Sequence, residues 1–343
     1  MLDFNLLNSQ AFLNGELIFR AFRKMKDAKK KVIDMLQTIS YVIIKFVFTC
    51  MGILPKSWRD RLGDALGMLI YKLDRRHRKV VLNNLNIAFG QEKTESEIQA
   101  LCGRCFKNLG RIVFDIGWIS VSNKTLDRYE VQGEEHIRRA YQQGKGVLIL
   151  TAHFGNWELL REAGYAVLKR FGWRSSIVAR RLDFEPLERF FLEVRSRLGT
   201  RVLPTKRKTY QAILEILADK VHKNNVVLLN DQRVDWYEGV FVNFFGALAC
   251  TNTGLARLAR QTGAPVVPLY VIRTENGFIG QFQPEIPWIH HDDEYWELAE
   301  NTQQYNNNIE AMVRKYPEQW FWVHNRWKTK PCCPWPNTHK EKV

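Results

Sequence analysis

The spacing of apolar positions along the chain changes near residue 126. Between residues 57 and 125, apolar residues recur three and four positions apart, as in Leu62, Leu66 and Leu69, with few turn signals. This period predicts helices. Beyond residue 126, short apolar runs alternate with helical patterns. That alternation predicts an α/β fold with a mixed, largely parallel sheet flanked by helices.

Short apolar runs bounded by turn residues predict the strands of this sheet. The expected strands are Gly146–Ala152, Ser175–Ala179, Arg201–Leu203, Val226–Asn230, Val266–Ile272 and Phe278–Phe282. The expected helices are 134–143, 156–170, 184–198, 207–222, 252–262 and 295–316. The run Val226–Leu229 does not alternate with polar residues, as is typical of a strand buried on both faces.

A basic leader and an apolar segment precede the helical part. Residues 35–54 are mostly apolar, with Lys45 near the middle, and Pro55 ends the run. About twenty such residues are enough to cross the hydrocarbon core of a bilayer. The sequence therefore predicts a membrane-anchor helix over residues 34–56, with a buried helix of a soluble domain as the alternative. Basic residues flank both ends, so the anchor spans the bilayer or lies at its surface.

These patterns divide the chain into consecutive parts. The expected organisation is a leader (1–33), the anchor (34–56), a main domain (57–331) and a tail (332–343). The main domain comprises a helical part (57–125) and an α/β part that carries the chemistry (126–331).

The net charge of the chain indicates which kind of partner it binds. The net charge of +15 calls for an anionic partner, and nucleic acid, an anionic bilayer or an acidic carrier protein would each fit.

Six cysteines show no disulfide framework: Cys102 and Cys105 form a single CxxC, and Cys332 and Cys333 are adjacent. We expect reduced thiols and no bound metal.

The leading candidate for chemistry is His153, at the end of the expected strand Gly146–Ala152. Glu158 follows five positions later, across a glycine. A strand end fixes the position of a base, and a carboxylate can hold its ring in one tautomer. Neither Ser nor Cys stands near the pair as a nucleophile. The pattern favours general-base activation of a hydroxyl, with a structural histidine as the alternative.

Neighbouring residues have positions suited to ligand contact. Gly155 would let the backbone approach a ligand closely, and Asn156 would cap a helix whose free N–H groups face the reaction centre. Asp231 and Gln232 end another expected strand. They face the same sheet edge as His153, where ligands of α/β folds bind. A structural turn is the alternative role for Gln232.

The string TAHFGNWE, residues 151–158, resembles the His-x4-acidic motif of glycerolipid and lipid A acyltransferases. The Glu at its last position and the Phe-Gly-Asn-Trp between His and Glu resemble the lipid A late acyltransferase family, the lauroyl and myristoyl transferases. The resemblance covers about residues 57–331, and Asn243 stands where the family usually has proline. Further matching segments follow in the family's order: Gly133–His136, Asn230–Gln232, Gly239–Gly246, Thr253–Pro268 and Pro317–Lys328.

The resemblance implies an enzyme that moves a fatty acyl group from an acyl carrier protein thioester to a hydroxyl of a lipid A precursor, in lipopolysaccharide biosynthesis. His153 would be the base and Glu158 its partner, without cofactor or metal. Arg181, before Glu185-Pro186-Leu187, would contact a phosphate or the developing oxyanion, unless it is solvated surface charge. Arg326 would bind phosphate, unless it belongs to a packed C-terminal cap.

The implied partners are acyl carrier protein, the lipid A precursor and lipids of the cell inner membrane, with the catalytic domain facing the cytoplasm and no nucleic acid bound. One alternative is an acyltransferase of the same mechanism that acts on lysophosphatidate or a glycolipid. Another is a non-catalytic protein that binds anionic lipid or nucleic acid. The His153–Glu158 pair argues against this last class, since a binding module needs no oriented base.

Overall fold

The computed structural model describes residues 4–122, 129–160, 172–205, 208–219 and 224–331, together with residues 162, 165, 167, 221 and 222. The tail 332–343 and the expected boundary at residues 125 and 126 lie outside these ranges. The chain forms two compact units, Met1–Val47 with Leu182–Phe191, and Phe48–Arg181 with Leu192–Val343.

The first unit contains most of α1 (Phe4–Ile53). The stretch Met25–Ile53 of this helix is long and apolar enough to cross a membrane, and most of it is exposed. The expected long apolar helix near the N-terminus is confirmed. It begins earlier than expected, because the basic leader continues the same helix.

Three helices open the second unit: α2 (Lys56–Leu73), α3 (Arg75–Phe89) and α4 (Glu95–Val121). Asp74 caps α3 by accepting a hydrogen bond from the N–H of His77. Thr94 and Glu97 form a capping box that begins α4. The helical spacing of this part of the sequence thus predicted its structure correctly.

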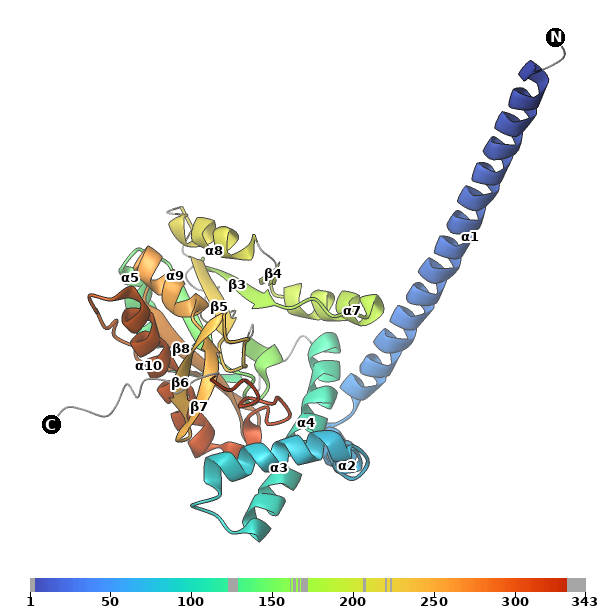
Figure 1. Ribbon diagram of the computed structural model, residues 1–343. Helices are drawn as coiled ribbons and strands as arrows, with labels where there is room; N and C mark the ends of the chain where they lie inside the picture. Colours follow the sequence, from blue (N-terminus) through green and yellow to red (C-terminus); the bar gives the residue numbers. More distant parts are fainter. Residues whose placement is uncertain are drawn as a thin grey trace. The chain divides into compact units, whose positions relative to one another are not determined.

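The main sheet has the strand order β1-β9-β8-β2-β5-β3-β4 (Figure 1). Neighbouring strands run parallel, except that β8 and β9 are antiparallel. The α/β class with a mixed, largely parallel sheet is confirmed. The strands are β1 (Tyr129–Gln132), β2 (Val147–Thr151), β3 (Arg174–Ala179), β4 (Arg201–Pro204), β5 (Asn224–Leu229), β8 (Val266–Arg273) and β9 (Phe278–Phe282).

Most of the remaining helices match the expected ranges, and α5, α8 and α9 pack on the sheet. They are α5 (Glu134–Gln142), α7 (Glu185–Ser196), α8 (Thr209–Ala218), α9 (Gly254–Thr262) and α10 (Glu294–Lys315). The expected helix 156–170 differs at its start, where a 3-10 turn, η2 (Trp157–Leu159), comes first. Beyond this turn, residues 160, 162, 165 and 167 are described, and they are helical.

A hairpin of β6 (Gly239–Phe244) and β7 (Ala247–Asn252) was not expected from the sequence. Phe245 and Gly246 form its turn, both with positive φ. The Asn-Gly or Asp-Gly signal of such a turn is missing here. The Asn243 side chain supports the turn by accepting from the N–H of Gly246 at 2.8 Å.

One hydrophobic core joins the helical part to the sheet. It includes Leu85 of α3, Leu101 of α4 and Leu148 of β2. Trp320, Trp322 and Trp327 of the C-terminal segment belong to the same core. The helices before the sheet and the segment after it therefore hold the sheet's edge in place.

Candidate active site

His153 and Asp231 meet at the carboxyl edge of the sheet. β2 and β5 are parallel neighbours with Thr151 opposite Leu229, and each of the two polar residues stands two positions beyond its strand. The N–H of Asn230 donates to the carbonyl of Thr151 at 3.0 Å, which extends the pairing past the strand ends. The strand register thus places the two side chains side by side.

Asp231, rather than Glu158, holds the His153 ring. The Asp231 Oδ1 atom lies 2.8 Å from Nδ1 of His153. Its Oδ2 atom accepts from the backbone N–H of His153 at 3.0 Å and from Nε1 of Trp320 at 2.8 Å. The expectation that Glu158 contacts the ring is corrected, because Asp231 occupies Nδ1. The carboxylate of Asp231 is buried, so it acts through His153 instead of through direct ligand contact.

The charges of this pair shift the pKa values of both partners. Burial disfavours the protonated imidazole, but the Asp231 charge, its hydrogen bond and the Glu158 charge outweigh burial and raise the pKa of His153. Burial opposes ionisation of Asp231, yet the charge and hydrogen bonds of His153 and Trp320 lower its pKa. An ionised carboxylate only accepts, so Nδ1 of His153 carries the proton and Nε2 of the neutral ring is the basic atom.

The Nε2 side of the ring faces a partly open, aromatic surface. The amide nitrogen Nε2 of Gln232 lies 3.4 Å from Nε2 of His153. The ring centroids of Trp157 and Phe321 lie 5.3 Å and 5.8 Å from that of His153. A substrate hydroxyl that reaches Nε2 therefore meets Gln232 and apolar walls suited to an acyl chain.

Glu158 forms a buried ion pair with Arg195 of α7. Two hydrogen bonds join them, from Nε at 2.9 Å and from Nη2 at 2.6 Å to the two carboxylate oxygens. Only 5% of the Glu158 side chain and 17% of the Arg195 side chain is exposed. Glu158 still acts on His153 through its charge. The sequence offered no signal for Arg195, since the ion pair depends on how α7 packs.

Gly155 and Asn156 serve the packing of the loop that follows His153, which corrects their expected roles. Gly155 has a φ of +58°, and a Cβ there would lie 1.7 Å from the carbonyl oxygen of Val271, so the backbone approaches β8 closely at this position. The Asn156 side chain makes no capping hydrogen bond. It is fully buried and donates to Oδ2 of Asp115 at 3.2 Å.

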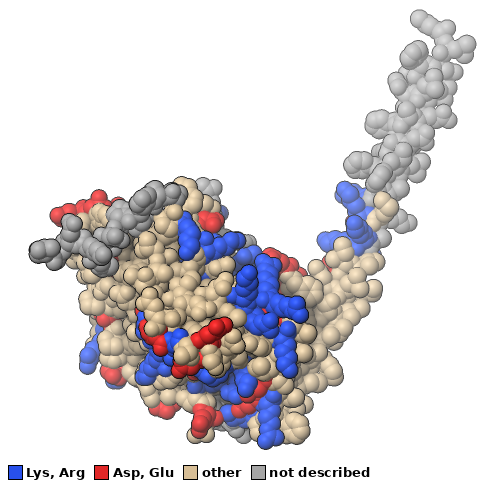
Figure 2. Space-filling view, turned by 60° about the horizontal axis from the view of Figure 1, so that its bottom comes forward, with Lys and Arg blue, Asp and Glu red and all other residues tan. Residues whose placement is uncertain are grey.

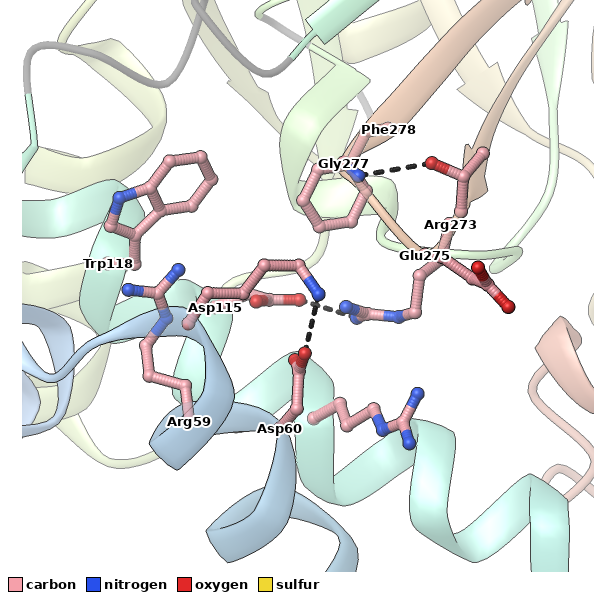
Figure 3. Close-up of a pocket in the computed structure, with 11 residues that line it drawn as sticks. Arg59, Asp60, Asp115, Trp118, Arg273, Glu275, Gly277 and Phe278 are labelled. Carbon is pink, nitrogen blue, oxygen red and sulfur yellow. Dashed lines mark hydrogen bonds and ion pairs between the residues drawn. The ribbon is translucent and has the colours of Figure 1, made fainter.

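Asp115 also lines a charged cavity. Arg273 donates to the same Oδ2 atom at 2.5 Å, and the pair lies in a cavity of about 310 Å³ that Arg59 and Trp118 help to line (Figure 3). Arg273 in turn receives a hydrogen bond from Gln319 at its backbone carbonyl, at 3.0 Å. Asp115 thus connects α4 to the strand and to the loop that carry the site.

The C-terminal segment fixes the backbone of His153 directly. The N–H of Phe321 donates to the carbonyl of His153 at 3.0 Å, and the N–H of Gly155 donates to the carbonyl of Gln319 at 2.8 Å. Phe154 and Trp320 form an antiparallel bridge. The family resemblance includes this Trp-rich segment, but no pattern in the sequence predicted its contact with His153.

The two arginines expected at the site differ in burial. Arg181 is exposed and stands two residues beyond the end of β3. It is not among the residues described above as contacting His153. Arg326 is fully buried and donates to the carbonyl of Cys250 at 2.7 Å and to Oδ1 of Asn306 at 3.3 Å. Burial lowers the pKa of Arg326 to about 10. The burial of Arg326 and its contacts with Cys250 and Asn306 favour the alternative of a packed C-terminal cap over phosphate binding.

The described residues offer the site a base but no metal centre. Among them, no group of three or more His, Cys, Asp or Glu side chains is arranged to hold a metal ion. The arrangement suits a general base that takes a proton at Nε2, because Nδ1 is held by a buried carboxylate.

Comparison with known proteins identifies relatives of the chain. The family profile described as bacterial lipid A biosynthesis acyltransferase matches residues 26–329. The lipid A biosynthesis lauroyltransferase of Escherichia coli is 31% identical over 281 residues, which cover 79% of this chain and 85% of that protein. The phosphatidylinositol mannoside acyltransferase of Mycolicibacterium smegmatis is 29% identical over 201 residues, 59% of this chain and 63% of that relative, less than two thirds of its length.

Proposed function

Since the chain belongs to the family of bacterial lipid A biosynthesis acyltransferases, we propose that it transfers a fatty acyl group from an acyl carrier protein thioester to a hydroxyl of a lipid A precursor. The observation that carries this proposal is the His153–Asp231 pair at the open sheet edge. It supplies a base with a raised pKa, whose Nε2 atom lies 3.4 Å from the amide nitrogen of Gln232 and next to apolar walls.

The proposed reaction is direct transfer between two substrates. Nε2 of His153 takes the proton of the acceptor hydroxyl. At the same time, the oxygen of this hydroxyl bonds to the carbonyl carbon of the thioester. The tetrahedral intermediate then collapses, the carbon–sulfur bond breaks, and the imidazolium returns the proton to the leaving thiolate. Asp231 balances the imidazolium charge throughout, and Glu158 adds a second negative charge near the ring. The products are an ester and a free carrier thiol.

Arg181 is the proposed contact for the acceptor phosphate or for the oxyanion. It is exposed near the carboxyl end of β3, which belongs to the same sheet as β2. The adjacent Arg180, also exposed, is the matched control. Arg181→Ala should lower the rate of transfer about 10²- to 10³-fold, the usual cost of a lost charged contact to a transition state, with Arg180→Ala much less affected.

The test of the function is a transfer assay with defined substrates. The full-length protein in membranes is incubated with acyl carrier proteins loaded with labelled chains of several lengths and with a tetraacyl lipid A precursor. Mass spectrometry should detect a precursor heavier by one labelled acyl group. A precursor that keeps its mass with every donor, while the protein is folded, contradicts the proposal.

A glycolipid acceptor is the second candidate. The similarity to a phosphatidylinositol mannoside acyltransferase, at an identity close to that of the lipid A enzymes, favours including it. The same assay with a phosphatidylinositol mannoside in place of the lipid A precursor separates the two. Faster transfer to the mannoside would assign the enzyme to this second acceptor class.

The apolar stretch of α1 supports a location in the cell inner membrane, with the catalytic part on the cytoplasmic side, where acyl carrier protein resides. Washing membranes with concentrated salt should leave the protein in the pellet, because salt screens charge but does not weaken apolar insertion. Release by salt alone would mean that charge holds the protein to the membrane.

A further inference from the structure

Helix α2 presents two faces of opposite character. One face packs on α4 through glycines: a Cβ at Gly67 would lie 2.2 Å from the carbonyl oxygen of Phe106, and one at Gly110 would lie 2.0 Å from that of Gly63. The two backbones therefore touch, and large side chains are excluded from the contact. Figure 1 shows α2 beside α4.

Another face of α2 carries exposed large apolar side chains. Trp58 is 56% exposed, Leu62 39%, Leu69 52% and Leu73 73%. Their spacing of four, seven and four residues places them on one stripe of the helix. Single exposed apolar residues are common on protein surfaces, but a continuous stripe marks a surface that contacts an apolar environment. We call these four residues the α2 stripe.

Charge at the edges of the α2 stripe indicates what that environment is. Arg61 and Lys72 of α2 are exposed, and so are Arg75, Arg76 and Lys79 at the start of α3. The acidic residues of α2 are neutralised, because Asp60 pairs with Lys56 at 2.5 Å and Asp64 with Arg111 at 2.6 Å. Figure 2 shows a cluster of Lys and Arg side chains on the face in view. An apolar stripe with basic margins is typical of a helix that lies in the surface of an anionic bilayer.

The chain itself brings α2 to such a surface. The apolar stretch of α1 ends at Ile53, which is exposed, and α2 begins three residues later, after Pro55. The last turn of α1 is fixed to α4, since a Cβ at Gly52 would lie 2.2 Å from the carbonyl oxygen of Gly117. The last turn of α1 and helix α2 are thus both packed against α4.

We propose that the α2 stripe lies at the boundary between headgroups and acyl chains of an anionic bilayer, with α2 parallel to the membrane plane. This proposal does not depend on the reaction that the enzyme catalyses. Through Asp115 of α4, which holds Asn156 and Arg273, a docked α2 also sets the position of the His153 loop relative to the lipid surface.

The test measures how deeply single positions enter the bilayer. A fluorescent NBD label is attached to Leu69→Cys or Leu73→Cys in the full-length protein, in which Cys50, Cys332 and Cys333 are replaced by serine. The buried Cys102, Cys105 and Cys250 remain. Val221→Cys, at a position that is 85% exposed, is the matched control. The proteins are reconstituted in phosphatidylethanolamine and phosphatidylglycerol vesicles that contain lipids with a nitroxide on the acyl chain.

The labels at positions 69 and 73 should be quenched several-fold more strongly than the label at 221, and their emission should shift to the blue. Equal quenching at all three positions overturns the proposal. Vesicles of phosphatidylcholine alone should give weaker quenching at 69 and 73, and undiminished quenching would overturn the role of the basic margin. Circular dichroism and acyl transfer by the labelled proteins verify that the fold is intact.

Discussion

The Nδ1 atom of His153 lies 2.8 Å from Oδ1 of Asp231, although 78 positions separate the two residues in the sequence. Asp231 also accepts the backbone N–H of His153 and the indole N–H of Trp320. One buried carboxylate therefore fixes the position of the loop, the orientation of the ring and the tautomer of the base. We therefore expect the chemistry of the site to depend on this contact more directly than on the His153–Glu158 spacing.

The first prediction concerns the pH dependence of transfer. Asp231 raises the pKa of His153, so in the wild type activity should fall as the pH drops through a value above the ordinary 6.5 of histidine. Asp231→Asn removes the charge. This should move the acid limb of the pH profile to lower pH and reduce the maximal rate on the order of 10²-fold or more. The measurement is kcat/KM against pH for both proteins.

Asp219→Asn is the control for this substitution, because Asp219 pairs with Nδ1 of His222 at 2.9 Å on the surface. Its pH profile should match that of the wild type. An unchanged acid limb in Asp231→Asn would show that Asp231 does not set the pKa of the base.

The second prediction is the loss of the base itself. His153→Ala should reduce the rate of transfer on the order of 10²- to 10⁴-fold, the usual contribution of a positioned general base. His222→Ala is the matched control, since His222 also pairs with an aspartate but lies away from the sheet edge. If His153→Ala kept more than about a tenth of the wild-type rate while His222→Ala was normal, another group would be the base.

The third prediction separates the structural role of Glu158 from its electrostatic role. Glu158→Ala leaves the guanidinium of Arg195 buried without its partner, which should cost about 3–5 kcal/mol in the free energy of unfolding. The exposed pair of Glu92 and Arg314 provides the control, and Glu92→Ala should cost at most about 1 kcal/mol. Urea unfolding of the variants measures both values.

The pH dependence of kcat/KM then measures the effect of the Glu158 charge on the pKa of His153. Glu158 raises the pKa of His153, so Glu158→Gln should move the acid limb of kcat/KM to lower pH, and Arg195→Ala should move it to higher pH. Shifts of the same sign in both variants would indicate that the ion pair acts only by holding the fold.

The fourth prediction concerns the turn after His153. Gly155→Ala adds a Cβ that would overlap the carbonyl oxygen of Val271, so β8 or the loop must move. Gly144→Ala is a matched control, because Gly144 has φ +71° and nothing within 4 Å of the added carbon. The control should cost about 1–2 kcal/mol for the left-handed backbone alone.

Gly155→Ala should cost more than Gly144→Ala and should also lower kcat, since His153 shares the displaced loop. Thermal unfolding and transfer assays test both effects. Equal stability of the two variants would contradict the close packing of Gly155 on β8.

The fifth prediction tests whether Arg326 has a structural role. Arg326→Ala removes buried hydrogen bonds to Cys250 and Asn306, so the free energy of unfolding should fall by about 2–5 kcal/mol. Lys328→Ala, at an exposed position of the same segment, should leave stability unchanged within about 0.5 kcal/mol. The folded fraction of Arg326→Ala should keep the wild-type KM for both substrates. A raised KM without loss of stability would restore a role in substrate binding.

Local sequence patterns predicted much of the fold because they report local physics. Six expected strands were found with small shifts at their ends, since strand-length apolar runs bounded by turn residues need little context. The hairpin of β6 and β7 was not predicted, because Phe245-Gly246 is not a usual turn pair. Packing of Phe245 in the core outweighs the preference of its backbone for negative φ.

Local patterns were enough to predict that a histidine ends a central strand and that Asp231 and Gln232 end another strand at the same edge. Which carboxylate contacts that histidine depends on the packing of distant segments. Glu158 is near it in sequence, but the turn η2 and the packing of α7 direct Glu158 to Arg195. The parallel register of β2 and β5 brings Asp231 to the ring instead. Burial likewise assigned Arg326 to the core, because a contact between distant segments depends on packing that no local pattern records.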